Sequence, residues 1–403
     1  MATTVTKNTV QFWQNKSFVF AVYFSSLLAL NIASLVSNRL YVWRIFRNAY
    51  THLIQNSNLY AFYPNEYNDS FLYSPSFPIV FYPFSVLPSL VGYFVWNNLS
   101  VLLVPFLIFK MPYLSVQKKA LACYIALIEI LTCMQGTQSN VMIVALLLLA
   151  FISFENKHYW VAAIAMAIGF YIKIFPIVMA SIFLLYPNKI NFLWKLATVM
   201  FILAVSPLLV ITPNSLIWQY QNWIAELTLD HKDNHGKISL VGLFQVFTGA
   251  SETKQLFFQA MGVSVLLLMY IRVKRFANYH YRLLFFSALL IWMVIFNHAA
   301  EVASYAIAVV GVALFFAYLR PRKNNRWYII FFLVVGCVIS IDPTPRVISN
   351  FMYDHALKTI PYFIVLIIII YQMIKPTFTF YISDIHAHNA DELIANNSHD
   401  IRS

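Results

Sequence analysis

Long apolar runs alternate with short polar stretches along almost the whole chain. A helix needs roughly 20 mostly apolar residues to cross the hydrocarbon core of a membrane, and reading for that length gives about twelve runs. The runs at Ser74 and Ala120 are short. The pattern predicts an all-α, polytopic integral membrane protein of about twelve transmembrane helices, which begin near Phe18, Ser74, Ser89, Ala120, Val141, Trp160, Phe192, Gln259, Leu283, Val302, Trp327 and Thr359.

Composition agrees with this fold class. The chain is 61% hydrophobic and only 10% charged, and its mean hydropathy of +0.69 excludes a water-soluble globule with a mixed surface. We expect one transmembrane domain over residues 1–376, with long loops at 38–71 and 213–254, followed by a cytoplasmic tail at 377–403. Any site must then be built from helices and those two loops.

Short loops rich in Lys and Arg predict the orientation, because such loops stay on the cytoplasmic side. Segments 272–275 and 320–326 are the densest of these. Threading twelve spans with both segments inside places the N-terminus in the cytoplasm, both long loops outside and the polar turn 135–140 inside. It also leaves Lys110, Lys118 and Lys119 outside, against the rule. The expected location is the cell (inner) membrane.

Charge and motifs exclude several classes. The net charge of +12 is spread over many loops, so anionic lipid is a better partner than nucleic acid. Neither GxGxxG nor GxxxxGK[ST] occurs, so no nucleotide cradle is visible. The cysteines lie in apolar runs without metal-ligand spacing. We expect no cofactor and no resident metal, and a divalent ion acting on a phosphate stays open.

Residues 59–88 hold the strongest functional signal. Here a polar loop with Glu66 and Asp69 leads into an aromatic, proline-rich stretch that starts at Tyr73. Carboxylates at the mouth of a membrane helix are costly and usually functional. Glu66 and Asp69 are therefore the candidate catalytic residues, against the alternative of ordinary solvated loop residues.

The start of the first loop reads as an amphipathic helix. Arg44 and Arg47 lie three residues apart, with Trp43, Phe46 and Tyr50 spaced as interfacial anchors. We expect this helix to lie on the membrane. Its arginines suit lipid head groups in general or one substrate phosphate.

Polar residues also interrupt the later apolar runs. Gln138 and Asn140 lie in the turn 135–140, and Lys173 lies inside an apolar run, three residues before Pro176. A lysine at membrane depth costs about 2.5 kcal/mol or more without a partner. An anionic phosphate would be such a partner, and snorkelling is the alternative.

A further polar group is predicted on the external side. His231 and His235 lie in the second long loop, and His298 and Glu301 lie between two spans, three residues apart. No HExxH motif accompanies them, so a metal site is disfavoured. They are candidates for substrate binding or for structural hydrogen bonds.

Taken in order, several short motifs resemble those of glycosyltransferase family 87. The similarity runs from about residue 38 to residue 301, and its order and spacing are more specific than any one motif. The residues that carry it are Leu59-Tyr60, Tyr73-Ser74-Pro75-Ser76-Phe77, Pro83-Phe84, Leu87-Pro88 with Trp96, Gln138-Ser139-Asn140, Lys173-Ile174-Phe175-Pro176 and Asn297-His298-Ala299-Ala300-Glu301.

The resemblance implies a GT-C fold and a polyprenyl-phosphate sugar as donor. Such enzymes pass the sugar, mannose or another hexose, to a glycolipid or glycan acceptor on the non-cytoplasmic face. A carboxylate takes the acceptor's proton, and basic or polar groups hold the leaving phosphate. The phosphate candidates are Arg44, Arg47, Lys173 and His298.

One position departs from the family's pattern. The family's usual catalytic aspartate follows the first span, where this chain has Asn38. We expect Asp69 to replace it, because Asp69 is nearest to the Tyr73 stretch, and Glu66 is nearly as good. A lipid-linked glycan polymerase or ligase and a lipid or solute transporter remain as alternative functions.

Overall fold

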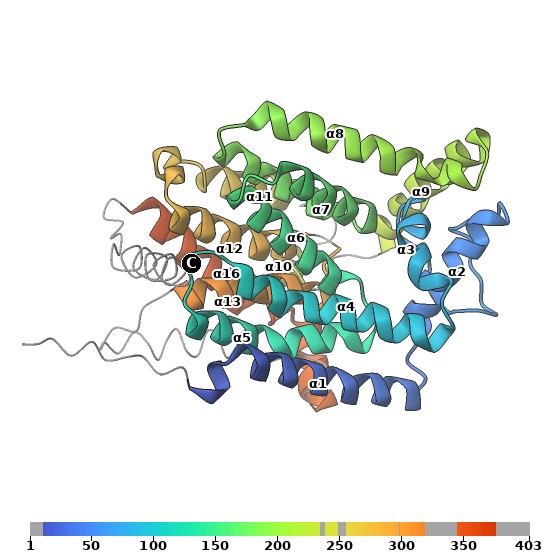
Figure 1. The fold of residues 1–403 in the computed structure, drawn as a ribbon, viewed down its shortest axis with the longest axis horizontal. Coiled ribbons are helices and arrows are strands. Elements are labelled where there is room, and N and C mark those ends of the chain that lie inside the picture. The colour runs from blue at the N-terminus through green and yellow to red at the C-terminus, as the bar shows by residue number, and fades with distance from the viewer. Residues whose placement is uncertain (1–10, 234–237, 249–254, 298, 319–344, 376–403) are drawn as a thin grey trace, which may run out of the picture.

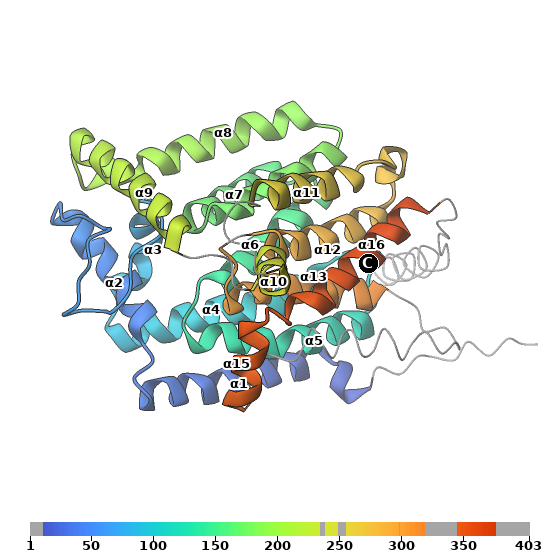
Figure 2. The ribbon, with the colours of Figure 1, turned by 180° about the vertical axis from the view of Figure 1, so that it is seen from behind.

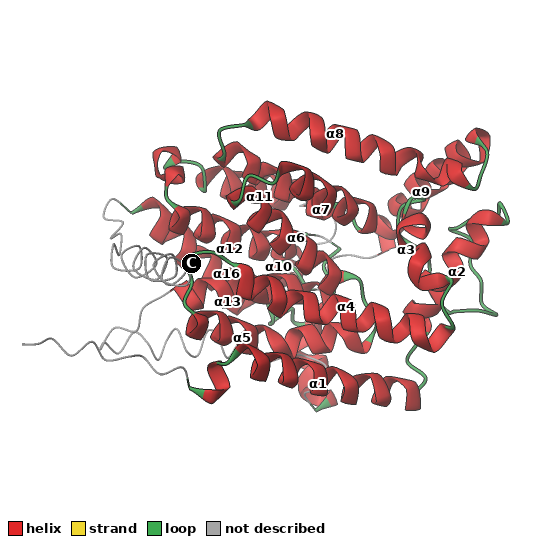
Figure 3. Ribbon diagram, in the orientation of Figure 1, coloured by secondary structure: helices red, strands yellow, loops and turns green. Residues whose placement is uncertain are grey.

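The computed structural model describes residues 11–233, 238–248, 255–297, 299–318 and 345–375, and in these residues every regular element is a helix (Figure 1, Figure 3). The elements are η1 (Phe12–Gln14), α1 (Lys16–Val36), α2 (Tyr41–Ile54), α3 (Phe77–Ser85), α4 (Ser89–Lys110), α5 (Val116–Gln135), α6 (Asn140–Glu155), α7 (Tyr159–Ile172), η2 (Phe175–Leu185), α8 (Lys189–Val205), η3 (Ser206–Leu209), α9 (Pro213–Asp233), α10 (Leu240–Thr248), α11 (Gln255–Leu268), η4 (Val273–Ala277), α12 (Tyr279–Ile295), η5 (Val302–Ser304), α13 (Tyr305–Tyr318), α15 (Arg346–Asp354) and α16 (Thr359–Ile374).

The predicted all-α class is confirmed, and several helices suit a membrane. Within the described part of the chain, α1, α4 and the segment Lys189–Leu209 are long and apolar enough to cross one. α15 and α16 meet at a bend of 55° and make a fourth span if they are taken together. Six more apolar helices are shorter, between 10 and 17 residues. The number of about twelve spans stays a prediction, and the predicted tail 377–403 lies outside the described residues.

The span predicted near Ser74 is wrong. This stretch forms α3, which is a helix of only 9 residues with Pro83 inside it. Proline removes a backbone donor and clashes with the preceding turn, so the helix ends early. α3 packs beside α2 at one end of the bundle (Figure 1), and the first full-length helix after α1 is therefore α4.

Removing this span reverses the direction of the next helices. α4 starts beside α2, where the Trp43 indole Nε1 donates to Ser89 Oγ at 3.2 Å, and it ends with Lys110 at the opposite end of the bundle. α5 starts there, with Lys119 Nζ donating to the Phe109 carbonyl at 2.9 Å. Lys110, Lys118 and Lys119 consequently share an end with Lys189, which resolves the conflict in the charge pattern. We call this the basic end.

The polar turn between α5 and α6 lies at the other end, which also carries α2, α3, α9 and the loop 55–76. We call it the loop end. The Ser139 hydroxyl donates to the Tyr73 hydroxyl at 3.4 Å, so turn 135–140 lies beside the first long loop. Its predicted placement on the face opposite to that loop is wrong, because it depended on the extra span.

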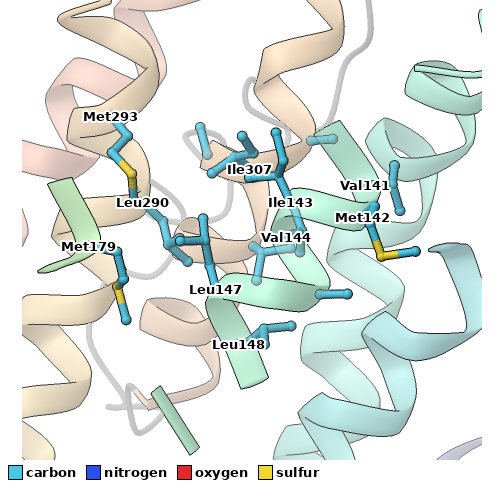
Figure 4. Packing of buried hydrophobic residues seen from close by; sticks show 14 of the residues in the cluster. Val141, Met142, Ile143, Val144, Leu147, Leu148, Met179, Leu290, Met293 and Ile307 are labelled. Atoms are coloured by element: carbon cyan, nitrogen blue, oxygen red, sulfur yellow. The ribbon is translucent and has the colours of Figure 1, made fainter. Parts of the chain in front are cut away.

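The core of the bundle is formed by α5, α6, α12 and α13, and α16 packs against α12 and α13 on the side that faces the viewer in Figure 2. Figure 4 shows apolar side chains from α6, α12 and α13 packed together. Gly311 lets α13 approach α12 closely, because a Cβ there would lie 2.5 Å from the Ser287 carbonyl oxygen. The Phe151 and Phe286 rings stack with centroids 4.4 Å apart. Close packing of this kind holds helices together where no water is available to drive hydrophobic association.

Within the part of the chain that the structure describes, two ion pairs join helices of the bundle. Inside the core, Lys358 Nζ lies 2.6 Å from Glu129 Oε1, and the two side chains are 0% and 1% exposed. At the basic end, Arg282 binds Glu155 through two parallel hydrogen bonds of 2.7 Å each. Bidentate pairing fixes the geometry of both side chains, so the second pair ties the end of α6 to the start of α12.

Candidate active site

The helix predicted at the start of the first loop is α2. Its buried face packs against α3 and α4, with the Phe46 ring 5.1 Å from Phe77, 5.3 Å from Phe81 and 6.1 Å from Trp96. Trp43 and Phe46 are 1% and 0% exposed. The prediction that they are interfacial anchors in lipid is therefore wrong, since they are packed inside the protein. The same aromatic pattern suits either environment.

The loop 55–76 returns along α2 and is held by α9. The Gln219 amide donates to the Ser57 carbonyl at 2.7 Å and accepts from the Leu59 N–H at 3.2 Å. Trp223 Nε1 donates to the Leu72 carbonyl at 3.2 Å. α9 therefore satisfies backbone groups at both ends of this loop, and such groups need partners when they are buried.

A pocket of about 480 Å³ opens between α2 and this loop. Asparagine amides, aromatic rings, one arginine and one carboxylate supply its chemistry. The lining residues are Asn38, Tyr41, Arg44, Pro64, Asn65, Glu66, Tyr67 and Asn68. Such a lining offers hydrogen bonds to hydroxyls, a cation for a phosphate and an acceptor for a proton.

The Glu66 carboxylate is fixed by two side chains of α2. Asn48 Nδ2 donates to Oε2 at 2.7 Å, and His52 Nε2 lies 3.2 Å from Oε1 and 3.1 Å from Oε2. Asn48 and His52 are one helical turn apart, so they share a face of α2. Glu66 keeps 36% of its side chain exposed and thus remains accessible from the pocket.

Two tyrosines lie close enough to feel the charge of this carboxylate. Burial raises the pKa of the Tyr67 phenol, and the negative charge of Glu66 raises it further. Burial likewise raises the pKa of Tyr63, with a smaller rise from Glu66. Both phenols therefore stay neutral at physiological pH and are hydrogen-bonding groups rather than bases.

Asp69 lies farther along the loop and is not among the pocket-lining residues. Its Oδ1 accepts from the Ser70 N–H at 2.8 Å, and the side chain is exposed. Along the chain, Asp69 is closer to Tyr73 than Glu66 is. Burial raises the pKa of the Tyr73 phenol, the Ser139 hydroxyl lowers it in part, and the charges of Glu301 and Asp69 raise it again.

The predicted arginines share α2 but differ in surroundings. Arg44 is exposed on the pocket rim, and its Nη2 donates to Asn38 Oδ1 at 2.9 Å. Arg47 is half-buried one turn later, and its Nε has no partner among the described residues. Only Arg44 lines the pocket.

A second polar group surrounds Tyr73 at the loop end. Ser74 Oγ donates to the Tyr171 carbonyl at 2.6 Å, which brings Tyr73 near Lys173. Lys173 follows the last residue of α7 and has an extended backbone, so the apolar run that contains it is not one continuous helix. Glu301 caps η5 and is exposed. Lys173 and Glu301 both lie within electrostatic reach of Cys133.

The turn beside Tyr73 carries two of the predicted residues. Gln138 is half-buried, and Asn140 is fully buried with neither amide atom paired among the described residues. Gly136 lies near the pocket, because a Cβ there would be 3.9 Å from the Tyr41 hydroxyl. The turn thus lies between the pocket and the second polar group.

Three histidines are predicted for this end. His235 and His298 lie outside the described residues, and so does the side chain of His231, although its backbone belongs to α9. In the part of the chain that is described, no three His, Cys, Asp or Glu side chains gather closely enough to hold a metal ion.

Sequence reasoning missed His52 and Asn48. Both lie on an amphipathic helix at a spacing of four residues, beside the two arginines that were identified. That spacing was the available signal. The sequence does not indicate that Glu66 is their partner, because Glu66 reaches α2 only after the chain turns back.

The helices and the pocket define a helical membrane protein with a polar site at one end of its bundle. The sequence model of glycosyltransferase family 87 matches residues 71–341, more than half of the chain. The protein belongs to this family. Membership confirms the predicted family and makes the protein a glycosyltransferase, with a sugar donor and an acceptor as substrates.

No curated protein and no solved structure matches the chain. The matched range includes Tyr73, Lys173 and Glu301 but begins after Glu66 and Asp69.

Proposed function

We propose that the protein is a multi-pass membrane glycosyltransferase that moves a hexose, mannose or a related sugar, from a polyprenyl-phosphate donor to a hydroxyl of a glycolipid or glycan. The reaction takes place in the pocket at the loop end. One observation carries this proposal: the Glu66 carboxylate is held by Asn48 and His52 and lines the same pocket as the Arg44 cation. A GT-C architecture and a location in the cell (inner) membrane belong to the same proposal.

Each group in the pocket has a task in an inverting transfer. Glu66 accepts the proton of the acceptor hydroxyl as the acceptor oxygen bonds to the anomeric carbon of the donor sugar. The bond between that carbon and the phosphate oxygen breaks, and the polyprenyl phosphate leaves with its added charge. Arg44 supplies the positive charge that stabilises this leaving group.

The geometry favours Glu66 over Asp69 as the base. The family resemblance implies an acidic residue near position 38, and Asn38 lines the same pocket as Glu66. A carboxylate from the loop thus reaches the place where the family's aspartate is expected. Asp69 lies outside this lining, so we propose that it is an ordinary solvated loop residue with no part in the reaction.

The second polar group extends the site toward the bundle. We propose that Tyr73, Gln138, Asn140, Lys173 and Glu301 bind the parts of the substrates that do not react. His231, His235 and His298 belong to the same proposal by sequence position, and Arg47 adds positive charge behind Arg44.

Charge distribution supports a non-cytoplasmic reaction. Arg272 Nε donates to the Ile374 carbonyl at 3.2 Å, which joins the basic segment 272–275 to the end of α16 at the basic end. Lys110, Lys118, Lys119 and Lys189 share that end. Basic residues are retained in the cytoplasm, so the loop end faces away from it. Nucleotide sugars are cytoplasmic, and a lipid-borne donor suits a site on the other face.

The test uses purified protein, polyprenyl-phosphate mannose and polyprenyl-phosphate glucose as donors and a membrane glycolipid extract as the source of acceptor hydroxyls, and it measures released polyprenyl phosphate. Wild-type protein is expected to release it from at least one donor, and Glu66→Gln is expected to lose this activity. Asp69→Asn, an equally conservative change three residues along the same loop, is the matched control and should retain turnover. No release from any lipid-linked sugar would contradict the proposal and favour a polymerase, a ligase or a transporter.

A further inference from the structure

His52 lies on α2 directly behind the proposed base. It is 5% exposed, and its ring stacks on Tyr63 with centroids 4.0 Å apart and planes 21° apart. Tyr67 lies at the side of the ring, 6.4 Å away at 49°. The imidazole is therefore held by packing on a regular helix, and it reaches the site only through Glu66.

The surroundings of the two ring nitrogens differ. Nε2 lies 3.2 Å and 3.1 Å from the two oxygens of Glu66. Nδ1 is buried and has no partner among the described residues. A neutral ring with its proton on Nε2 satisfies both conditions, because Nε2 then donates to the carboxylate and Nδ1 has no hydrogen that needs a partner. An imidazolium would bury an unpaired N–H, which is costly.

Asn48 and His52 both donate hydrogen bonds to Glu66, so the carboxylate is the only one of the three groups that can accept a proton here. Asn48 donates to Oε2 at 2.7 Å, and Nε2 of His52 lies within hydrogen-bond distance of both oxygens. Each carboxylate oxygen has two lone pairs and can accept two hydrogen bonds. A lone pair therefore remains for the proton of an incoming hydroxyl. Asn48 and His52 cannot take that proton, since the nitrogen that each directs at Glu66 already carries hydrogen and has no lone pair to accept another.

We propose that His52 is a positioning residue: as a neutral Nε2–H donor it holds the Glu66 carboxylate turned toward the pocket. This inference depends on the proposed function, in which Glu66 is the base. It adds that the chemical step requires a donor at position 52, whereas substrate binding does not.

Two substitutions separate donation from packing. His52→Phe keeps a ring on Tyr63 and removes the donor, whereas His52→Gln places an amide donor near the position of Nε2. We expect His52→Phe to lower kcat on the order of tenfold to a hundredfold with little change in KM, because a hydrogen bond to a charged group is lost. His52→Gln should retain most of the wild-type kcat. His158→Gln, an exposed histidine at the basic end, is the control.

The tautomer is tested without substrate. In protein labelled with ¹⁵N at histidine, the His52 signals should show a protonated Nε2 and a bare Nδ1, and Glu66→Gln should shift the Nε2 signal. Equal kcat in wild type and His52→Phe, or a proton found on Nδ1, would overturn the positioning role. Full turnover in Glu66→Gln would instead overturn the proposed function, so the two failures are distinguishable. If His52→Phe does not fold, the labelled wild-type protein still decides.

Discussion

The ion pair between Glu129 and Lys358 is the most sharply testable feature of the core. It joins α5 to the start of α16, and Lys358 Nζ also lies 5.3 Å from the centre of the Tyr305 ring. The Tyr305 hydroxyl lies 2.8 Å from Thr359 Oγ1. Both charged side chains are almost completely buried. Removing one partner therefore leaves the other charge in a low-dielectric interior.

The size of the effect follows from this burial. Breaking a buried pair by removing one partner costs about 3 to 5 kcal/mol, whereas replacing both charges with apolar groups of similar volume is often close to neutral. We expect Lys358→Met to destabilise the protein by that amount. The double variant Glu129→Leu with Lys358→Met should recover at least half of the loss. Lys189→Met, a change of the same type at an exposed position of the basic end, should have little effect.

Thermal unfolding of detergent-solubilised protein measures these differences. Cys123 and Cys133 are free and buried, so a thiol-reactive fluorophore reports their exposure on unfolding. Lys358→Met should lower the apparent Tm by several degrees, on the order of 5 °C or more for a chain of this size. A double variant as unstable as the sum of the two single changes would refute the reasoning, because it would show that uncompensated charge is not the cause.

Three further predictions concern the site. Asn38→Asp should restore part of the turnover lost in Glu66→Gln, because both positions line one pocket and Asn38 has a φ of 53°, a conformation that aspartate also tolerates; a double variant no more active than Glu66→Gln would count against a shared pocket. Gln219→Leu should speed hydrogen exchange at the Leu59 amide by at least tenfold in mass spectrometry, and unchanged exchange would show that α9 does not hold the loop. The raised pKa of Tyr67 means that the folded state keeps a proton that the unfolded chain loses above about pH 10, so stability should fall above that pH, and Tyr67→Phe should reduce this fall in alkaline unfolding curves.

The apolar runs predicted the fold class correctly. They gave a wrong span where only the length of the run distinguished a membrane-spanning helix from a shorter one. The stretch after Ser74 is as apolar as a span, but its prolines limit α3 to 9 residues. That single error placed turn 135–140 on the wrong face and left three lysines apparently outside. The charge pattern contained the warning, since moving Lys110, Lys118 and Lys119 to the basic end restores the rule.

Sequence identified the residues of the site more reliably than their arrangement. Arg44 and Glu66 were both candidates, and they line one pocket. The ranking of Asp69 above Glu66 used distance along the chain from Tyr73, whereas the pocket depends on how the loop folds back on α2. Trp43 and Phe46 were misplaced for a related reason, because an aromatic helix face has the same pattern against lipid and against protein.

The rate of polyprenyl phosphate release by Glu66→Gln tests the central claim most directly. The amide keeps the size of the side chain and can still fill the space between Asn48 and His52, but it cannot accept a proton. A general base contributes typically about 10²- to 10⁴-fold to a rate, so we predict a loss within that range while Asp69→Asn stays near wild type. Release by Glu66→Gln within about twofold of wild type would contradict the account, because a loss of about 10²-fold is the least that a missing base predicts.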